Sequence, residues 1–299
     1  MTRIQANLLL LLAAAIWGGG FVAQSTGMEA IGPFWFISLR FAIAALLLLP
    51  FALFEKRKFT ERMTSSKKLL FICVGIALFG GASAQQVGLQ TTTVTNSAFI
   101  TGLYVIFVPL IAVIFLKKPP HWIVWPGAIM AATGIFLLSG GSLSALTKGD
   151  GFTLLCALCW AAQITLAGMA VKVTECPLSL SCAQFAVTAL GGGAVALATE
   201  SFSWSAVVQA APEILYLGLF SSGLAFSLQI VGQRYTTPSQ AAIFLSSEAV
   251  FGAALGALLL GERITVLGYA GCALMLAAML VTELVPELAQ RRQLARKST

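Results

Sequence analysis

The chain has 299 residues, of which 58% are hydrophobic and only 10% are charged. Soluble proteins usually carry about 25% charged residues, so this composition excludes a soluble domain and indicates a chain that lies mostly within a lipid bilayer. The net charge of +7 is spread over short loops, where Lys and Arg set the orientation of a membrane protein, and it does not point to nucleic-acid binding.

Ten apolar segments, each about twenty residues long, are predicted to cross the bilayer as helices, because lipid leaves no partner for unpaired backbone groups. The first follows one basic residue, as in a signal peptide, but its apolar run continues to about Gly27, so we expect it to be retained. The expected limits are 7–27, 33–54, 68–88, 93–116, 121–141, 151–171, 179–199, 212–232, 239–260 and 264–284.

Lys and Arg residues alternate between the two sides of these spans. Most fall in the loops on one side, including the run "EKRKFTERMTSSKK" between the second and third spans, whereas only Lys148 and Arg263 fall on the other. Basic loops stay on the cytoplasmic side. The alternation therefore supports ten spans with both termini in the cytoplasm.

The two halves of the chain match at a constant separation of 144 residues, as between positions 40 and 184. "RFAIAAL" at 40–46 matches "QFAVTAL" at 184–190, and Pro33 matches Pro177. Because each half holds an odd number of spans, the second enters the membrane from the opposite side. We therefore expect an all-α membrane protein with two inverted five-helix repeats at 1–144 and 145–288, followed by a basic cytoplasmic tail at 289–299. Inverted repeats are typical of alternating-access transporters, with the substrate site near the midplane.

Four stretches resemble one known family: "WGGGFVAQSTG", "LRFAIAALLLLP", "TNSAFITGLYVIFVPLIAVIFLKKP" and "LSSEAVFGAALGALLLGERIT". They are similar to the EamA-like, ten-helix branch of the drug/metabolite transporter superfamily, and within it look most like the YddG-type exporters of aromatic amino acids and methyl viologen. The resemblance implies a multi-pass exporter of the bacterial inner (plasma) membrane, with a central cavity lined mainly by spans 1, 3, 4, 6, 8 and 9. It does not identify the cargo.

Polar and aromatic side chains near mid-membrane depth are the candidate substrate-binding residues. Trp17 and Trp160 match between the two halves at a separation of 143 residues, and they either form a wall for an aromatic or apolar substrate or simply pack between helices. The polar candidates either bind an amino acid or join helices through hydrogen bonds. The full set is Trp17, Phe79, Ser97, Thr101, Tyr104, Trp160, Gln163, Ser222, Ser246, Ser247 and Glu248.

Two charged residues lie inside expected spans. Glu248 and Tyr104 share one repeat position, so their side chains should meet if spans 4 and 9 cross at the pseudo-twofold axis. The carboxyl either couples transport to protons or cations, or fixes the packing of span 9. Arg40 either reaches outward, pairs with backbone carbonyls, or pairs with Glu248.

The remaining patterns narrow the function class. An intramembrane enzyme would need a nucleophile with its base, an aspartate pair or a metal cluster, whereas no Asp lies within a span and His121 is the only histidine. No filter sequence or polar helix face indicates a channel, and no cofactor or ATP motif is present. We expect a gradient-driven, monomeric exporter whose partners are the bilayer and a small molecule. Amino acids are the leading cargo and organic cations such as methyl viologen the alternative, since a phosphate carrier would need more cationic residues than Arg40.

Overall fold

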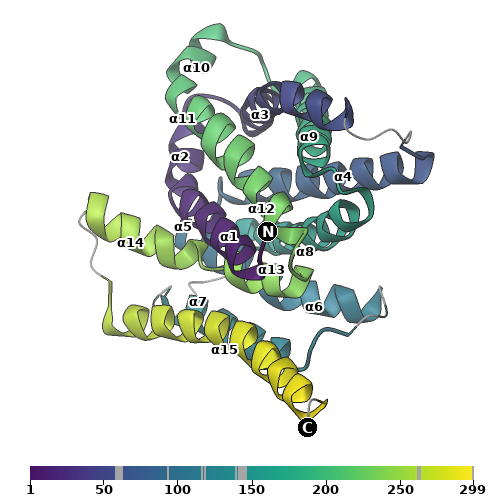
Figure 1. Cartoon of the computed structure of the whole chain (residues 1–299). Coiled ribbons are helices and arrows are strands. Elements are labelled where there is room, and N and C mark those ends of the chain that lie inside the picture. The colour runs from purple at the N-terminus through teal and green to yellow at the C-terminus, as the bar shows by residue number, and fades with distance from the viewer. Residues whose placement is uncertain are drawn as a thin grey trace.

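The computed structural model describes residues 1–57, 63–92, 94–115, 117, 119–138, 140, 147–260 and 264–297. Every regular element within these ranges is a helix (Figure 1). The first half holds α1 (Arg3–Gly18), α2 (Gly20–Gly27), α3 (Pro33–Arg57), α4 (Ser65–Gly88), α5 (Val94–Gly102), α6 (Tyr104–Ile114) and α7 (Val124–Leu138). The second holds α8 (Lys148–Thr174), α9 (Pro177–Thr199), α10 (Trp204–Gln209), α11 (Ala211–Tyr216), the π-helix η1 (Leu217–Ala225), α12 (Phe226–Gln233), α13 (Pro238–Leu245), α14 (Glu248–Leu260) and α15 (Val266–Lys297).

Within the described part of the chain, seven helical segments are long and apolar enough to cross a membrane: Pro33–Glu55, Ser65–Gly88, Ser97–Ile114, Lys148–Thr174, Pro177–Thr199, Ala211–Gln233 and Val266–Pro286. α1 and α7 are apolar but shorter. Each expected span coincides with one helix or with consecutive helices of the structure. The chain is thus an all-helical membrane protein, while the count of ten spans stays a prediction.

The two long helices α3 and α9 occupy matching positions in the two halves, and their ends hold each other. Glu55, near the end of α3, accepts hydrogen bonds from the backbone N–H groups of Leu178 (3.2 Å) and Ser179 (2.7 Å) at the start of α9. In return Glu200, after α9, accepts from Phe34 (2.9 Å) and Trp35 (3.0 Å) at the start of α3. The two helices are therefore antiparallel, as inverted repeats predict.

The last helices of the halves, α7 and α15, form a second such pair at one edge of the bundle (Figure 1). Gly134 and Gly271 face one another so closely that a Cβ on Gly271 would lie 2.4 Å from the Gly134 carbonyl oxygen. Gly127, near the start of α7, lies instead against Thr282, which follows Gly271 by three turns along α15. These contacts again place matching helices antiparallel, with glycine allowing the close approach.

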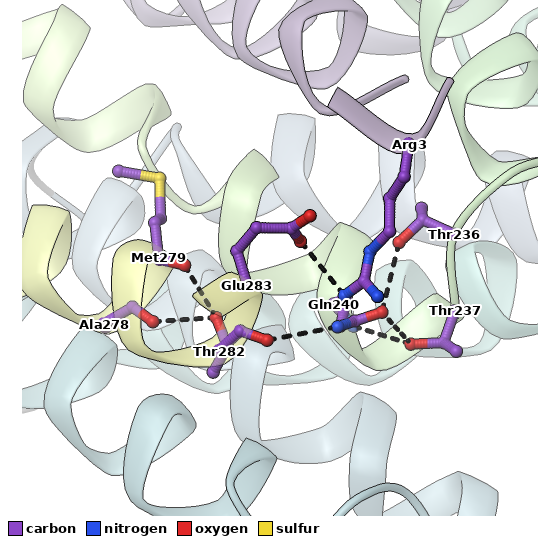
Figure 2. Close-up of polar contacts among 8 residues, drawn as sticks. All are labelled: Arg3, Thr236, Thr237, Gln240, Ala278, Met279, Thr282 and Glu283. Carbon is purple, nitrogen blue, oxygen red and sulfur yellow. Dashed lines mark hydrogen bonds and ion pairs between the residues drawn. The ribbon is translucent and has the colours of Figure 1, made fainter. Parts of the chain in front are cut away.

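The N-terminal end of α1 is joined to the second half by a polar cluster (Figure 2). Arg3 Nη2 lies 3.0 Å from Glu283 Oε2 of α15, as an ion pair without hydrogen-bond geometry. Beside it, Gln240 of α13 donates from Nε2 to the Thr282 carbonyl oxygen (3.2 Å) and accepts from the Thr237 hydroxyl (3.1 Å). The cluster therefore connects α1, α13 and α15.

Candidate functional site

An expected span is broken into two helices at the same repeat position in each half. α5 ends at Gly102 and α6 begins at Tyr104, while α13 ends at Leu245 and α14 begins at Glu248. Discontinuous helices are a recurrent feature of transporter binding sites, because they bring polar groups to membrane depth. Tyr104 and Glu248 each stand at the start of the second helix of an interrupted pair.

These two side chains meet. The Tyr104 hydroxyl donates a hydrogen bond of 3.3 Å to Glu248 Oε1, which confirms the contact predicted from the repeat. The finding also explains how a carboxyl is accommodated in an apolar segment: Glu248 faces its counterpart in the other half and an internal cavity.

That cavity lies between the halves, and the space between its lining side chains, counted together with its opening to solvent, is about 550 Å³. Its walls come from α1, α2, α3, α4, α5 and α6 of the first half and from α8, η1, α12 and α14 of the second. The lining residues are Trp17, Gln24, Arg40, Gln85, Thr101, Tyr104, Trp160, Gln163, Ile164, Ser221, Phe226, Gln229 and Glu248.

One wall of the cavity is aromatic. Phe226 lies between the two tryptophans, with its ring centroid 4.6 Å from that of Trp17 and 5.5 Å from that of Trp160, on which it stacks. Phe41 and Phe185 pack around the same ring from outside the cavity. The predicted Trp17 and Trp160 therefore do both things considered for them, since they line the cavity and also pack between helices.

The indole of Trp17 is oriented by a hydrogen bond across the halves. Its Nε1–H donates to the Ser221 carbonyl oxygen at 3.0 Å, which satisfies the polar group that a buried tryptophan carries. Ser221 belongs to the π-helix η1, and π-helical turns are frequent at functional sites.

Two lining glutamines, Gln85 and Gln229, were missed by the sequence analysis although they lie 144 residues apart. Gln229 Nε2 donates to Gln163 Oε1 (3.0 Å) and to Gln233 Oε1 (3.3 Å), and Gln163 Nε2 donates to Gln184 Oε1 (3.0 Å). Buried amides thus form a row leading away from the cavity. The same repeat offset that linked Tyr104 to Glu248 could have identified Gln85 and Gln229.

Arg40 also lines the cavity. Its side chain is buried, with 4% of the residue exposed, so it does not reach outward as one expectation had it. The guanidinium carbon lies 4.9 Å from the ring centroid of Phe41 and 5.6 Å from that of Phe36, and Nε has no hydrogen-bond partner. Among the described residues no ion pair joins Arg40 to Glu248, which corrects the pairing considered from sequence.

Six of the predicted site residues line the cavity: Trp17, Thr101, Tyr104, Trp160, Gln163 and Glu248. The others lie elsewhere. Phe79 packs on Gly191 of α9, and Ser97 and Ser222 are buried with unpaired hydroxyls. The hydroxyls of Ser246 and Ser247 donate to the carbonyls of Ile243 (2.8 Å) and Phe244 (2.6 Å) in the same segment. These two serines therefore bond to backbone carbonyls at the helix break, and they do not join one helix to another.

An all-helical membrane protein with antiparallel matching halves and one shared, mixed polar and aromatic cavity has the architecture of a transporter. Two copies of one family model match the chain, at residues 4–140 and 147–284, and the model is that of the EamA-like transporter family. The chain belongs to this family, a branch of the drug/metabolite transporter superfamily, as the motifs indicated. The narrower YddG-type assignment stays a prediction.

The individual relatives share a third or less of their residues with this chain. The chain is 32% identical to an uncharacterized transporter of Archaeoglobus fulgidus over 94% of this chain and 87% of that protein. It is 24% identical to the threonine/homoserine exporter RhtA of Escherichia coli K12 over 86% of this chain and 84% of that one. A solved crystal structure with 18% identity superposes with a TM-score of 0.79, covering 97% of this chain and 99% of the other, and so shows the same fold.

Proposed function

We propose that the chain is a secondary transporter that exports amino acids, including aromatic ones, across the bacterial inner membrane by alternating access. In this proposal ten spans cross the membrane, both termini are cytoplasmic and the monomer is the working unit. The observation that carries it is the central cavity that Trp17, Tyr104, Trp160 and Glu248 line, because its walls come from both inverted halves and relative movement of the halves can open such a cavity to either side.

The chemistry of the walls supports an amino acid as the cargo. The cavity combines an aromatic surface at Trp17, Trp160 and Phe226 with one cationic and one acidic side chain. Amino acids carry both charges and a variable side chain, so each kind of wall has a counterpart in the cargo. The relation to a threonine/homoserine exporter is in line with this class of substrate.

The alternative cargo is an organic cation such as methyl viologen, with or without coupling to protons. Glu248 in the cavity favours it, because a buried carboxylate attracts a cation and aromatic faces stabilise one. Arg40 on the same cavity opposes it, because like charges repel strongly where water is excluded. The presence of both residues therefore favours amino acids.

Uptake into liposomes containing the purified protein tests the proposal. Labelled threonine, phenylalanine and methyl viologen are supplied separately, with and without a pH gradient. We expect saturable uptake of at least one amino acid above that of protein-free liposomes. Uptake of methyl viologen alone would establish the alternative, and a response to the pH gradient would show proton coupling.

A further inference from the structure

Building on the proposed function, we infer that Arg40 and Glu248 are the two poles of a recognition site for zwitterions. In this site the Arg40 guanidinium binds the carboxylate of the cargo, and the Glu248 carboxylate binds its ammonium group. The aromatic wall between the two tryptophans is left to contact the cargo side chain.

The guanidinium of Arg40 is incompletely coordinated. A guanidinium has five N–H donors, yet Arg40 is buried, its Nε has no partner, and its guanidinium lies over the rings of Phe36 and Phe41. Aromatic rings stabilise a cation but accept no strong hydrogen bonds. Burial of a charge is costly unless an opposite charge or hydrogen bonds compensate it. Because Arg40 borders the cavity, a carboxylate bound there would supply both.

Glu248 is placed to bind the ammonium group of the cargo. Tyr104 engages one carboxylate oxygen, Oε1, whereas an ionised carboxylate offers about four positions for donors. Nearby on the cavity wall, the Oε1 atoms of Gln24 and Gln229 are buried acceptors without partners. An ammonium group has three N–H donors, so it can be shared between Glu248 and such neutral acceptors.

The two charges also select against other ligand classes. Arg40 and Glu248 border one cavity without pairing to each other. A simple anion would satisfy Arg40 but meet Glu248, and a simple cation would satisfy Glu248 but meet Arg40. Only a molecule with both charges compensates both side chains. A buried charge left unpaired is a strong source of discrimination between otherwise similar ligands.

The test compares three ligands with the same side chain and different charged groups: phenylalanine, phenylalaninamide, which lacks the carboxylate, and N-acetylphenylalanine, which lacks the ammonium. A matching set is made for threonine. Each unlabelled compound competes with uptake of the labelled parent amino acid into liposomes. For the wild type we expect both analogues to compete at least about tenfold more weakly than the parent, since each leaves one buried charge unpaired.

The variants Arg40→Gln and Glu248→Gln should each abolish one half of this preference. R40Q should no longer discriminate against the amide but should still reject the N-acetyl compound, and E248Q should do the reverse. Arg234→Gln is the matched control, because Arg234 pairs with Glu175 away from the cavity, and it should keep both preferences. If R40Q does not fold, Arg40→Lys is used instead, since it retains the charge without the planar fork. In R40K, competition by the parent amino acid should weaken more than competition by the amide.

The outcomes separate this inference from the function on which it rests. If the wild type transports neither amino acid, the proposed function is wrong and the inference falls with it. If the wild type transports an amino acid but R40Q, or its substitute R40K, keeps the wild-type ratio of amide to parent, only the inference is overturned. Loss of selectivity in R234Q as well would also overturn it, because the effect would not be specific to the cavity.

Discussion

The Tyr104 hydroxyl lies 3.3 Å from Glu248 Oε1, and these residues are 144 positions apart, at the same place in the two halves. A contact between matching positions is the mark of a pseudo-twofold axis passing between them. The axis therefore runs through the cavity, where two interrupted helices face each other. A side chain at this position contacts the other half, so its contacts depend on how the two halves are placed.

Replacement of Tyr104 by Phe should slow transport while leaving the fold intact. The variant keeps the ring but removes the hydroxyl that bonds Glu248. A hydrogen bond of this kind contributes about 1–1.5 kcal/mol, so we expect the uptake rate to fall by up to about tenfold. The thermal unfolding of the purified variant serves as its control and should show a folded protein whose unfolding temperature falls by no more than a few degrees. Uptake equal to that of the wild type would show that the contact is not used in transport.

Replacement of Gly18 by Ala should disturb both stability and transport. A Cβ on Gly18 would lie 2.6 Å from the Gly252 backbone nitrogen and 2.9 Å from the Glu248 carbonyl oxygen. Backbone atoms cannot turn aside, so α1 and α14 must separate, at a cost of about 1–3 kcal/mol. Thermal unfolding in detergent measures the loss. Gly151→Ala is the control, since a Cβ on Gly151 would meet nothing within 4 Å, and equal effects of the two variants would contradict the close contact.

Removal of the carboxylates that hold α3 and α9 together should destabilise the protein without altering cargo preference. Glu200→Ala leaves the N–H groups of Phe34 and Trp35 without their acceptor, and Glu55→Ala does the same at the start of α9. Each loss resembles that of a helix cap, about 1–2 kcal/mol.

Because the two contacts lie at opposite ends of α3, their effects should add in the double variant. The comparison is made by thermal unfolding, with Glu29→Ala, on an exposed side chain, as the control. Strong non-additivity would mean that the two ends are coupled, contrary to an independent cap at each end.

Replacement of Phe226 by Ala should shift the cargo range toward larger side chains. The Phe226 ring fills the space between Trp17 and Trp160, so its removal leaves room between the two indoles. We expect the ratio of tryptophan to threonine uptake to rise, although the protein should lose about 3–5 kcal/mol of stability. Phe202→Ala, at an exposed ring paired with Trp35, should leave the ratio unchanged. An unchanged ratio in F226A would place the cargo elsewhere.

The internal repeat was the most informative sequence signal, because a twofold relation converts a sequence offset into a spatial contact. It predicted that Tyr104 meets Glu248, and it placed Trp17 and Trp160 at matching depth on the same cavity. Applied to every polar residue, the same offset would have added Gln85 and Gln229.

The side of each helix that faces the cavity could not be predicted from depth. In lipid the outward face of a helix is as apolar as its packed face, so hydrophobic periodicity does not separate them. Ser222 lies at the expected depth, yet its neighbour Ser221 lines the cavity, because adjacent residues point in different directions and η1 alters the helical register. The surroundings of Arg40 could not be predicted for a related reason. The sequence does not show whether a charged side chain inside a span faces an internal cavity or extends to the membrane surface.

We propose that the cavity between the halves is reached from each side of the membrane in turn. Labelling of a single cysteine at Thr101, a lining residue, tests it in a variant whose six native cysteines are replaced. Ser97→Cys, buried on the same helix but outside the lining, is the control and should not react. In oriented vesicles, an impermeant thiol reagent should modify the cysteine at position 101 from either side, and more slowly with saturating amino acid. Modification from one side only would contradict alternating access.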